Sequence, residues 1–258
     1  MSHPRRVFID FPDGSRPVYG TEALLSEQDS HHLRTVLRLK EGDQLTAVDR
    51  ASGQEYDAII CKLGEPLTAR ILGQKEKRAG CSRVKSLIFC LAKGGNTDLV
   101  CEKACELGVQ HIVLWQSQRS VVRIDNERDA GKKIERWRKI VESAAKQSGN
   151  DLIPSISLAL NYESLIERVS PLRSPEDRSF ICSLSPDSKL PSNTPAPHAY
   201  VHLAVGPEGD FTEKEESALV GVGFERLSLG PLVLRCETAA IVAISMIHGA
   251  WGFLDQKN

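Results

Sequence analysis

Long apolar runs are absent from this chain of 258 residues. None reaches the roughly 18 residues that a membrane-spanning helix needs. The first ten residues, MSHPRRVFID, also lack the apolar centre of a secretory signal peptide. We therefore expect a cytoplasmic protein with no membrane partner.

Paired cysteines are absent as well. The seven cysteines are an odd number, lie at irregular spacing and form no CxxC motif. Cys101 and Cys105 would share one face of a helix, but no cluster of further Cys or His residues accompanies them. This pattern argues against a disulfide framework and against a zinc site. We expect reduced, largely buried thiols and no metal.

The common nucleotide-binding motifs are missing. The chain contains neither GxxxxGK[ST] nor GxGxxG, which argues against a P-loop and against a dinucleotide fold. No Ser-His-Asp or Cys-His arrangement can be inferred from the spacing either. Catalysis by a hydrolase-type nucleophile is therefore not indicated.

Net charge is almost absent, at −1, which argues against wholesale binding of nucleic acid. The sum hides an asymmetry, however. Residues 76–150 hold 15 Lys/Arg against 9 Asp/Glu, a net charge of +6, whereas residues 151–258 carry −6. The basic middle is either a phosphate-facing surface or a solvated helix face, and charge alone leaves both interpretations open.

The first part of the chain consists of short β-like runs separated by turn residues, a pattern typical of a small barrel. One helix is expected at about 26–38, because Ser26 is a good N-cap residue and Asp29 follows three positions later. The apolar stripe of this helix would consist of Leu33, Val36 and Leu37. We assign residues 1–74 to this domain and residues 75–85 to a polar linker.

Residues 86–258 alternate apolar strands with helices, which predicts a parallel sheet in an α/β domain. The expected strands cover residues 86–92, 111–115, 179–184 and 200–205. The expected helices cover residues 97–108, with Gly108 at the C-terminal cap, 128–147 and 161–169, and a further helix begins after a capping box of Thr212 and Glu215. The last segment, ETAAIVAISMIHGAWGFL, is apolar on nearly every side, so we expect it to be buried all round and covered by a second subunit.

Two Gly-Pro turns, Gly206-Pro207 and Gly230-Pro231, each follow a short apolar run and each precede a helix-like segment. Glycine permits a sharp turn and a close approach of a ligand to the backbone, and proline fixes the turn. A lone Gly-Pro pair usually only punctuates a loop. Two such elbows, each with a glutamate nearby (Glu208 and Glu237), predict that two strand ends of one sheet form a single pocket rim.

This rim is acidic, because Glu208 and Asp210 follow the first elbow and would repel phosphate. It suits a neutral or cationic ligand, and S-adenosylmethionine, with its sulfonium and ammonium groups, is one such ligand. Arg235, Glu237 and Thr238 stand at the start of the final helix, where backbone N–H groups lack helical partners. Arg235 can hold a phosphate or a developing oxyanion, whereas Glu237 can equally be a carboxylate that favours the helix dipole.

The segments VGPEGDFTEKE and LSLGPLVLRCETAA together resemble the RsmE family of 16S ribosomal RNA uridine N3-methyltransferases, which belong to the SPOUT class. EKACELGVQHIV, QRSVV, WRKIVESAAKQSG and the N-terminal HHLRTVLRLKEGD resemble family segments in the family's order. The resemblance covers nearly the whole chain. It implies an S-adenosylmethionine-dependent enzyme that methylates N3 of a uridine in 16S rRNA or the small ribosomal subunit.

The resemblance also implies a fold and a set of site residues. A PUA-like β-barrel would grip RNA, and the SPOUT domain would form a homodimer and thread its C-terminus into a trefoil knot. Arg235 and Glu237 would be catalytic. The cofactor would be bound by Val205, Gly206, Pro207, Glu208, Gly209, Leu229, Gly230, Leu234, Glu237, Thr238 and Ala239. RNA would be bound by His32, Arg34, Arg38, Lys93 and Arg119.

The chain departs from the family pattern at several positions. Leu232 and Asn150 stand where basic residues are usual, the loop that begins with Lys93 lacks a second cation, and Asp210 replaces a common glycine. Two alternatives therefore remain beside the leading interpretation. One is a SPOUT enzyme that acts on another RNA atom, such as a ribose 2′-hydroxyl. The other is a non-catalytic RNA-binding or assembly protein on the same fold.

The chemistry of uridine N3 defines what such a site must supply. N3 carries a proton at neutral pH and becomes a good nucleophile only when that proton leaves. A positioned carboxylate contributes about 10²–10⁴-fold as a general base. There are two candidates for this role. Glu237 could act as the general base, or Arg235 could be the cation that stabilises the uridinate.

Overall fold

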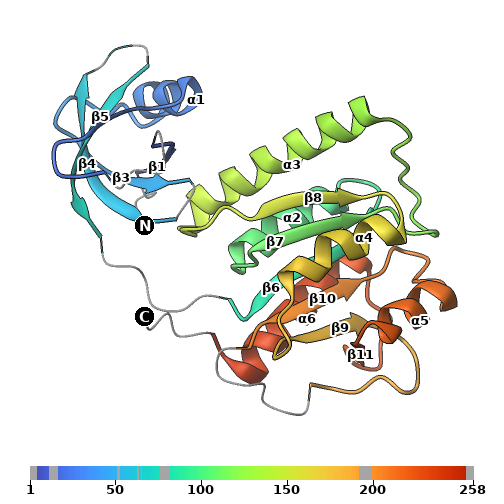
Figure 1. The fold of residues 1–258 in the computed structure, drawn as a ribbon. Helices are drawn as coiled ribbons and strands as arrows, with labels where there is room; N and C mark the ends of the chain where they lie inside the picture. The colour runs from blue at the N-terminus through green and yellow to red at the C-terminus, as the bar shows by residue number, and fades with distance from the viewer. Residues whose placement is uncertain are drawn as a thin grey trace. The chain divides into compact units, whose positions relative to one another are not determined.

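The computed structural model describes residues 5–11, 17–50, 53–62, 64, 66–75, 82–191 and 199–253. Contacts between residues divide the chain into two compact units (Figure 1). Unit 1 comprises residues 1–78 and 145–153, and unit 2 comprises residues 79–144 and 154–258.

Unit 1 is built on one curled five-stranded sheet with the order β1-β3-β4-β5-β2. Its strands are β1 (Arg6–Ile9), β2 (Glu22–Leu24), β3 (Gln44–Asp49), β4 (Glu55–Lys62) and β5 (Thr68–Gln74). β1 runs parallel to β3, and the other pairs are antiparallel. Two register shifts between β4 and β5 bend the sheet. The predicted barrel is thus a half-barrel, with β1 and β2 at its edges.

The helix expected at 26–38 is present as α1 (Glu27–His31) followed by one π-helical turn (His32–Val36). Ser26 caps it as predicted, since its Oγ accepts the backbone N–H of Asp29 at 3.0 Å. The prediction for Val36 was wrong, because this side chain is 62% exposed. The switch from α- to π-helical winding rotates Val36 away from the core that Leu33 enters.

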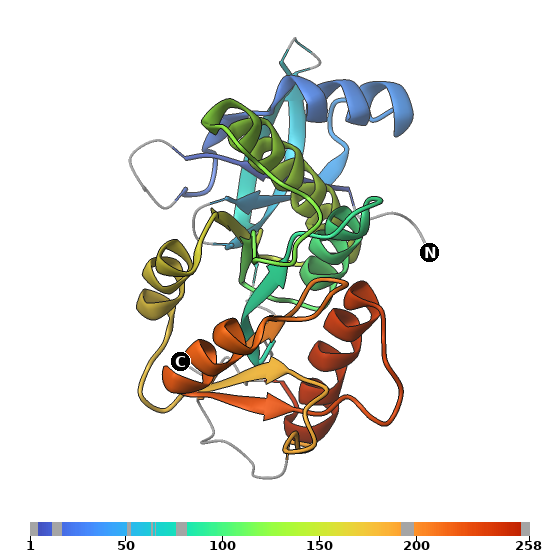
Figure 2. The same ribbon diagram turned by 90° about the vertical axis from the view of Figure 1, so that its right-hand side faces the viewer.

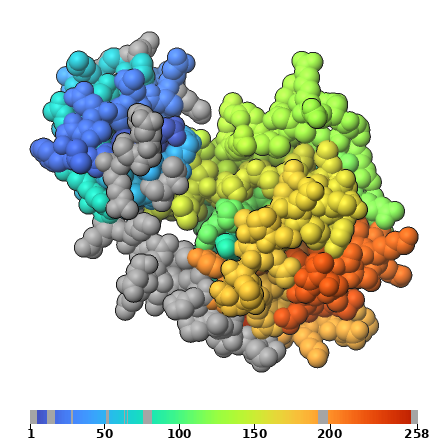
Figure 3. Space-filling model, in the orientation of Figure 1, coloured from blue at the N-terminus to red at the C-terminus, as the bar shows by residue number. Residues whose placement is uncertain are grey.

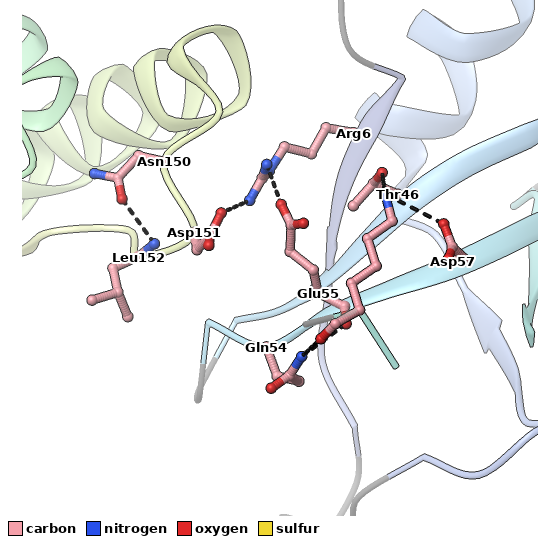
Figure 4. Close-up of polar contacts among 9 residues, drawn as sticks. Arg6, Thr46, Gln54, Glu55, Asp57, Asn150, Asp151 and Leu152 are labelled. Atoms are coloured by element: carbon pink, nitrogen blue, oxygen red, sulfur yellow. Dashed lines mark hydrogen bonds and ion pairs between the residues drawn. The ribbon is translucent and has the colours of Figure 1, made fainter. Parts of the chain in front are cut away.

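A buried ion-pair group closes one side of unit 1 (Figure 4). The guanidinium of Arg6, only 3% exposed, contacts the carboxylates of Glu55 and Asp151. Lys146 Nζ lies 2.6 Å from Asp29 Oδ1. Gly53 has a φ of +67°, and a methyl group there would meet Leu152 at 2.7 Å. The segment 145–153 is therefore packed into unit 1, and removing one partner from such a buried pair would leave an uncompensated charge.

Unit 2 contains a six-stranded sheet in which every pair is parallel. The parallel arrangement was predicted, but the strands at residues 155–159 and 224–227 were not among the four expected. The order is β11-β9-β10-β6-β7-β8. The strands are β6 (Val84–Cys90), β7 (His111–Trp115), β8 (Ser155–Ala159), β9 (Arg178–Cys182), β10 (Val201–Val205) and β11 (Phe224–Leu227). The helices are α2 (Asn96–Glu106), α3 (Glu127–Ser148), α4 (Tyr162–Val169), α5 (Glu213–Gly221) and α6 (Cys236–Trp251), with a 3₁₀ turn (Ser170–Leu172) after α4. The last four residues of α3 belong to unit 1.

The helices of unit 2 cover both faces of its sheet (Figures 1 and 2). α4 and α5 cover one face, where Trp115 stacks on Phe211 with ring centroids 5.7 Å apart. α2 and α6 pack together on the other face. α2 ends as predicted, because Gly108 takes a φ of +78° and donates its N–H to the carbonyl of Cys105.

The expectation that the last helix is buried all round is wrong for the single chain. Ala240, Ala243 and Ile244 of α6 are buried against the sheet. Ser245 and Gly249, however, are exposed on its other side. The sequence showed that α6 is apolar, but a helix that packs on one face of the sheet is covered by the sheet on that side only.

A buried polar chain joins β6 to β10 at the start of the strands. Ser86 Oγ lies 2.7 Å from His202 Nδ1, and His202 Nε2 lies 3.2 Å from Asp177 Oδ2. Burial lowers the pKa of His202 to about 4. Burial alone would raise the pKa of Asp177, but backbone N–H groups of Tyr200 and Ser174 and the imidazole outweigh it and lower that pKa. His202 is therefore neutral at physiological pH.

We expect the His202→Gln variant to reduce the acid sensitivity of the fold. From pH 6.5 down to about 4, the unfolded chain binds a proton at this histidine that the folded protein does not bind, so stability falls as the pH falls. Between pH 7 and pH 5, the wild type should lose about 2 kcal/mol more unfolding free energy than the variant. Urea denaturation at both pH values measures the difference. Equal losses in the two proteins would contradict the assignment.

Candidate functional site

The first elbow lies directly after β10, at the centre of the sheet of unit 2. Gly206 and Pro207 follow the last residue of the strand and are buried. A methyl group at Gly206 would stand 3.2 Å from Asp210 Oδ1 and from the ring of Phe211. Glycine at this position therefore allows the loop to fold back on itself.

The loop after the first elbow is held in a tight turn. The N–H of Asp210 donates to the carbonyl of Pro207 at 2.9 Å, and Asp210 takes a φ of +62°. The left-handed conformation explains why glycine would be usual there, and aspartate is among the residues that tolerate it. Arg119 Nη1 donates to the carbonyls of Gly209 and Phe211 at 3.0 and 3.1 Å. Arg119 therefore braces this loop.

The helix behind the first elbow begins with the predicted capping box. The backbone N–H of Glu215 donates to Thr212 Oγ1 at 3.3 Å, and the N–H of Thr212 donates to Glu215 Oε2 at 2.9 Å. Glu215 Oε1 also accepts the N–H of Gln118 at 2.7 Å. One carboxylate thus fixes both the start of α5 and the loop that carries Arg119.

The loop after β6 meets both elbows. The N–H of Lys93 donates to Glu208 Oε1 at 3.1 Å, and Asn96 Nδ2 donates to Glu237 Oε2 at 3.0 Å. β6 and β10 are neighbours, but the next strands along the chain, β7 and β11, lie on opposite sides of them. This is a topological switch point, where a crevice opens beyond the carboxyl ends of the strands.

The second elbow follows β11 and leads into α6. Gly230 takes a φ of +115°, which only glycine adopts readily. Arg235 is the N-cap residue of α6, but its side chain makes no capping hydrogen bond. The first N–H groups of a helix have no partner within it, so donors at the start of α6 are available to a ligand.

A cavity of about 560 Å³ opens where these loops meet. Its volume falls in the range of about 300–1,000 Å³ that is typical of sites for small molecules and cofactors. Its lining is formed by Lys93, Asn96, Cys182, Ser183, Leu184, Val205, Gly206, Pro207, Glu208, Asp210, Leu229, Gly230, Leu232, Val233, Leu234, Arg235, Cys236, Glu237 and Ala239. The prediction that both elbows form one pocket rim is confirmed.

Most residues predicted to bind the cofactor meet in this cavity. They are Val205, Gly206, Pro207, Glu208, Leu229, Gly230, Leu234, Glu237 and Ala239. Gly209 and Thr238 are exposed neighbours that do not line it. Arg235 and Glu237, predicted to be catalytic, line it together, and Lys93, predicted to bind RNA, also lines it.

The remaining residues predicted to bind RNA lie elsewhere. Arg119 is exposed beside the first elbow and donates to its backbone. His32 and Arg38 are exposed in unit 1, and Arg38 takes a φ of +51°. Arg34 Nη2 donates to the carbonyl of Gly64 at 3.0 Å, so part of this guanidinium serves the fold of unit 1.

Sequence reasoning missed the wall of the cavity that follows β9. Cys182, Ser183 and Leu184 line the cavity because β9 lies between β10 and β11 in the sheet. Glu216 fixes this wall, since its Oε1 accepts Ser183 Oγ at 2.8 Å and Arg226 Nε at 2.7 Å. No local sequence pattern reveals that β9 lies between β10 and β11, because the order of strands in a sheet depends on the path of the whole chain. The further lining residues are Asp210, which the sequence placed in the acidic rim but not among the binding residues, and Asn96, Leu232, Val233 and Cys236, which were not predicted.

The chemistry of the cavity depends on carboxylates and a guanidinium. Burial raises the pKa of the Cys182 thiol to about 12, and burial together with the neighbouring Glu237 carboxylate raises that of Cys236 to about 12. Neither thiol is a nucleophile at neutral pH, because the thiolate is the reactive form. Among the described residues, no group of His, Cys, Asp and Glu could hold a metal ion, and no helix is long and apolar enough to span a membrane.

Comparison with known proteins supplies the family. A model of an RNA methyltransferase domain matches residues 82–248, and a model of an RNA methyltransferase PUA domain matches residues 25–71. The ribosomal RNA small subunit methyltransferase E of Mycobacterium tuberculosis is 30% identical over 245 residues, which are 93% of this chain and 90% of that protein. This chain belongs to the small subunit methyltransferase E family.

Two solved structures of similar proteins extend the family likeness to the fold. A methyltransferase of Legionella pneumophila in complex with the cofactor SAM is 29% identical, with a TM-score of 0.82 over 97% of this chain and 99% of that one. The family enzyme of Neisseria gonorrhoeae bound to S-adenosyl methionine is 28% identical, with a TM-score of 0.81 over 96% and 98%. The predicted α/β fold of the SPOUT class, preceded by a curled sheet, is confirmed.

We expect Gly206→Ala to damage the cavity, because the added methyl group would force the ring of Phe211 to move. Overpacking of this kind costs about 1–3 kcal/mol. Urea denaturation measures the cost. Gly221→Ala is the matched control, since at that end of α5 no described residue beyond the neighbouring backbone lies within 4 Å of a methyl group. A Gly206→Ala variant as stable as the control would show that the loop is not packed as described.

Proposed function

We propose that this protein transfers a methyl group from S-adenosylmethionine to N3 of a uridine in 16S ribosomal RNA. The observation that carries the proposal is the cavity at the switch point, in which both elbows of the family motifs meet. The names of the similar proteins support the substrate and the cofactor. The proposed place of action is the cytoplasm.

The residues of the cavity fit this cofactor. Val205, Leu234 and Ala239 supply apolar surface for an adenine ring. Glu208 and Glu237 supply negative charge, which suits a sulfonium and an ammonium group and does not suit a phosphate. Backbone donors at the start of α6 suit a carboxylate. When bound, the cofactor supplies an electrophilic methyl group. The proposed binding set is the nine lining residues named above, with Gly209 and Thr238 beside them.

Two side chains of the cavity can prepare the uridine. Glu237 Oε2 is held by Asn96, and the structure gives its Oε1 no hydrogen-bond partner within the described ranges, so this oxygen is available to take the N3 proton. Arg235 is exposed at the same rim and forms no ion pair there with any described residue. Its guanidinium can stabilise the uridinate or hold a phosphate. The rest of the rate would come from holding N3 in line with the methyl group.

We further propose that residues 1–74 grip the RNA through His32, Arg34 and Arg38, joined by residues 75–85 to a methyltransferase domain of residues 86–258. Lys93 and Arg119 would contact the RNA beside the cavity. In this proposal the C-terminal region forms a trefoil knot and pairs with a second copy of the chain. The exposed side of α6, with Ser245 and Gly249, supports a homodimer, because an apolar helix left half uncovered favours association.

Calorimetry and methyl transfer together test the function. The protein should bind S-adenosylmethionine, and it should move tritium from the labelled methyl group to small-subunit RNA. Nucleoside analysis should then find the label on the uracil base. Label on a ribose would favour a 2′-hydroxyl enzyme, and binding of RNA without methyl transfer would favour a non-catalytic protein.

Glu237→Gln should lower kcat by about 10²–10⁴-fold at neutral pH, because the amide cannot accept the N3 proton. Affinity for S-adenosylhomocysteine, measured by calorimetry, should change much less than kcat. Glu213→Gln is the matched control, since Glu213 is exposed on α5 and does not line the cavity. Full methyl transfer by the Glu237→Gln protein would rule out the general base.

Gly249→Arg should convert the proposed homodimer into a monomer in light scattering. Within one chain, no described residue beyond the neighbouring backbone lies within 4 Å of a methyl group at this position. Gly131→Arg, on α3, is the control, because no described residue beyond the neighbouring backbone lies within 4 Å of a methyl group there either. It should leave the molar mass of the homodimer unchanged. A wild type that is monomeric at micromolar concentration would refute the homodimer.

A further inference from the structure

The outward side of α3 carries a row of cations that the proposed site does not use. Arg128, Lys132, Arg136 and Lys139, here called the α3 basic stripe, follow one another at spacings of four, four and three residues. At about 100° per residue they fall within an arc of roughly 80°. This arc lies opposite Trp137, which is buried beneath the helix. Figure 3 shows atoms of α3, in light green, exposed on the surface of unit 2.

Three of the four cations are not neutralised by the fold. Arg136 contacts the carboxylate of Asp98. Arg128, Lys132 and Lys139 are exposed, and the structure shows no ion pair between them and any carboxylate of the described residues. Glu135 stands three residues after Lys132 and four before Lys139, yet no such contact joins it to either. Three cations of the stripe are therefore available to a ligand, while the exposed carboxylates of Asp129 and Glu135 lie at the two edges of the stripe and lower its net positive charge.

The spacing of the stripe is unfavourable for the helix itself. Like charges four residues apart repel each other on a helix surface, and this arrangement occurs twice, from Arg128 to Lys132 and from Lys132 to Arg136. The nearby Lys133 is held differently, with its ammonium 5.9 Å from the centre of the Trp137 ring. A polyanionic partner would compensate this repulsion.

We propose that the α3 basic stripe binds phosphates of the RNA substrate at a surface separate from the cofactor cavity. The proposal rests on the proposed function, because an RNA methyltransferase brings a polyanion to this chain. The stripe is about 16 Å long, at 1.5 Å per residue. That length accommodates several successive phosphates of one strand, which lie about 3.4 Å apart along the axis of a duplex. Exposed cations without partners suit such contacts, since they release counterions when they bind.

The test compares two double variants that lose the same charge. Lys132→Gln/Lys139→Gln removes two cations of the stripe. Lys189→Gln/Lys214→Gln removes two exposed lysines elsewhere on unit 2. Binding of deproteinised 16S rRNA is measured by filter binding at several salt concentrations. The stripe variant should show a salt slope smaller by about 1.5 and a Kd raised roughly tenfold near 0.1 M salt, because each lost phosphate contact removes about 0.7–0.9 from the slope. The salt slope of the control variant should differ from that of the wild type by less than about 0.5.

Several outcomes decide the matter. If both double variants weaken binding equally, net charge explains the effect and the stripe proposal falls. The stripe proposal is also refuted if the stripe variant binds RNA as tightly, and with the same salt slope, as the wild type. If the wild type methylates the RNA in that case, the proposed function is still supported. If the stripe variant lowers the salt slope of RNA binding as expected but the wild type transfers no methyl group, the proposed function is refuted and the stripe proposal is supported. Calorimetry with S-adenosylhomocysteine should give the same affinity for all three proteins, which shows that the cavity is intact.

Discussion

The pairing of β10 with β6 on one side and β9 on the other is the constraint on which the cavity depends. β10 is fully buried, and its register with β6 places Val205 opposite Phe89, so both strands end at the same level. The loops that follow β6, β10 and β9 therefore leave the sheet side by side. The path from β11 to α6 then brings the second elbow to the same edge. A parallel sheet without a switch point would have separated these loops with covering helices.

The loops at this edge are held by polar contacts that do not compete with a ligand. Glu215 fixes the start of α5, Arg119 holds the carbonyls of the first elbow, and Glu216 fixes the wall after β9. Arg235, in contrast, faces the cavity and forms no ion pair with any described residue. This division is physically sensible, because a site is precise only when the supporting contacts are separate from the binding ones. The cavity thiols take no part in the proposed chemistry, because burial keeps them protonated.

Charge is distributed in this protein so that two surfaces can attract different ligands. The cavity is rimmed by Glu208, Asp210 and Glu237, which favours a cationic cofactor and disfavours phosphate. Lys93 and Arg235 also line the cavity, whereas further exposed cations lie outside it, on α3 and in the helix of unit 1. A net charge close to zero is thus compatible with an RNA-binding protein, because attraction depends on the local field and not on the sum. The buried group around Arg6 shows another use of charge, because its ion pairs hold residues 145–153 within unit 1.

The sequence by itself determined the features that depend on neighbours along the chain. The parallel strands, the caps at Thr212 and Gly108 and the two glycine elbows follow from local patterns, and the resemblance of the elbow motifs named the family before any fold was known. Only the tertiary structure decided which strands are neighbours, and hence that the end of β9 lines the cavity. It also decided that Val36 is exposed, that α6 is covered on one side only, and that residues 145–153 pack into unit 1. These outcomes depend on contacts between residues far apart in the chain, and no local pattern encodes them.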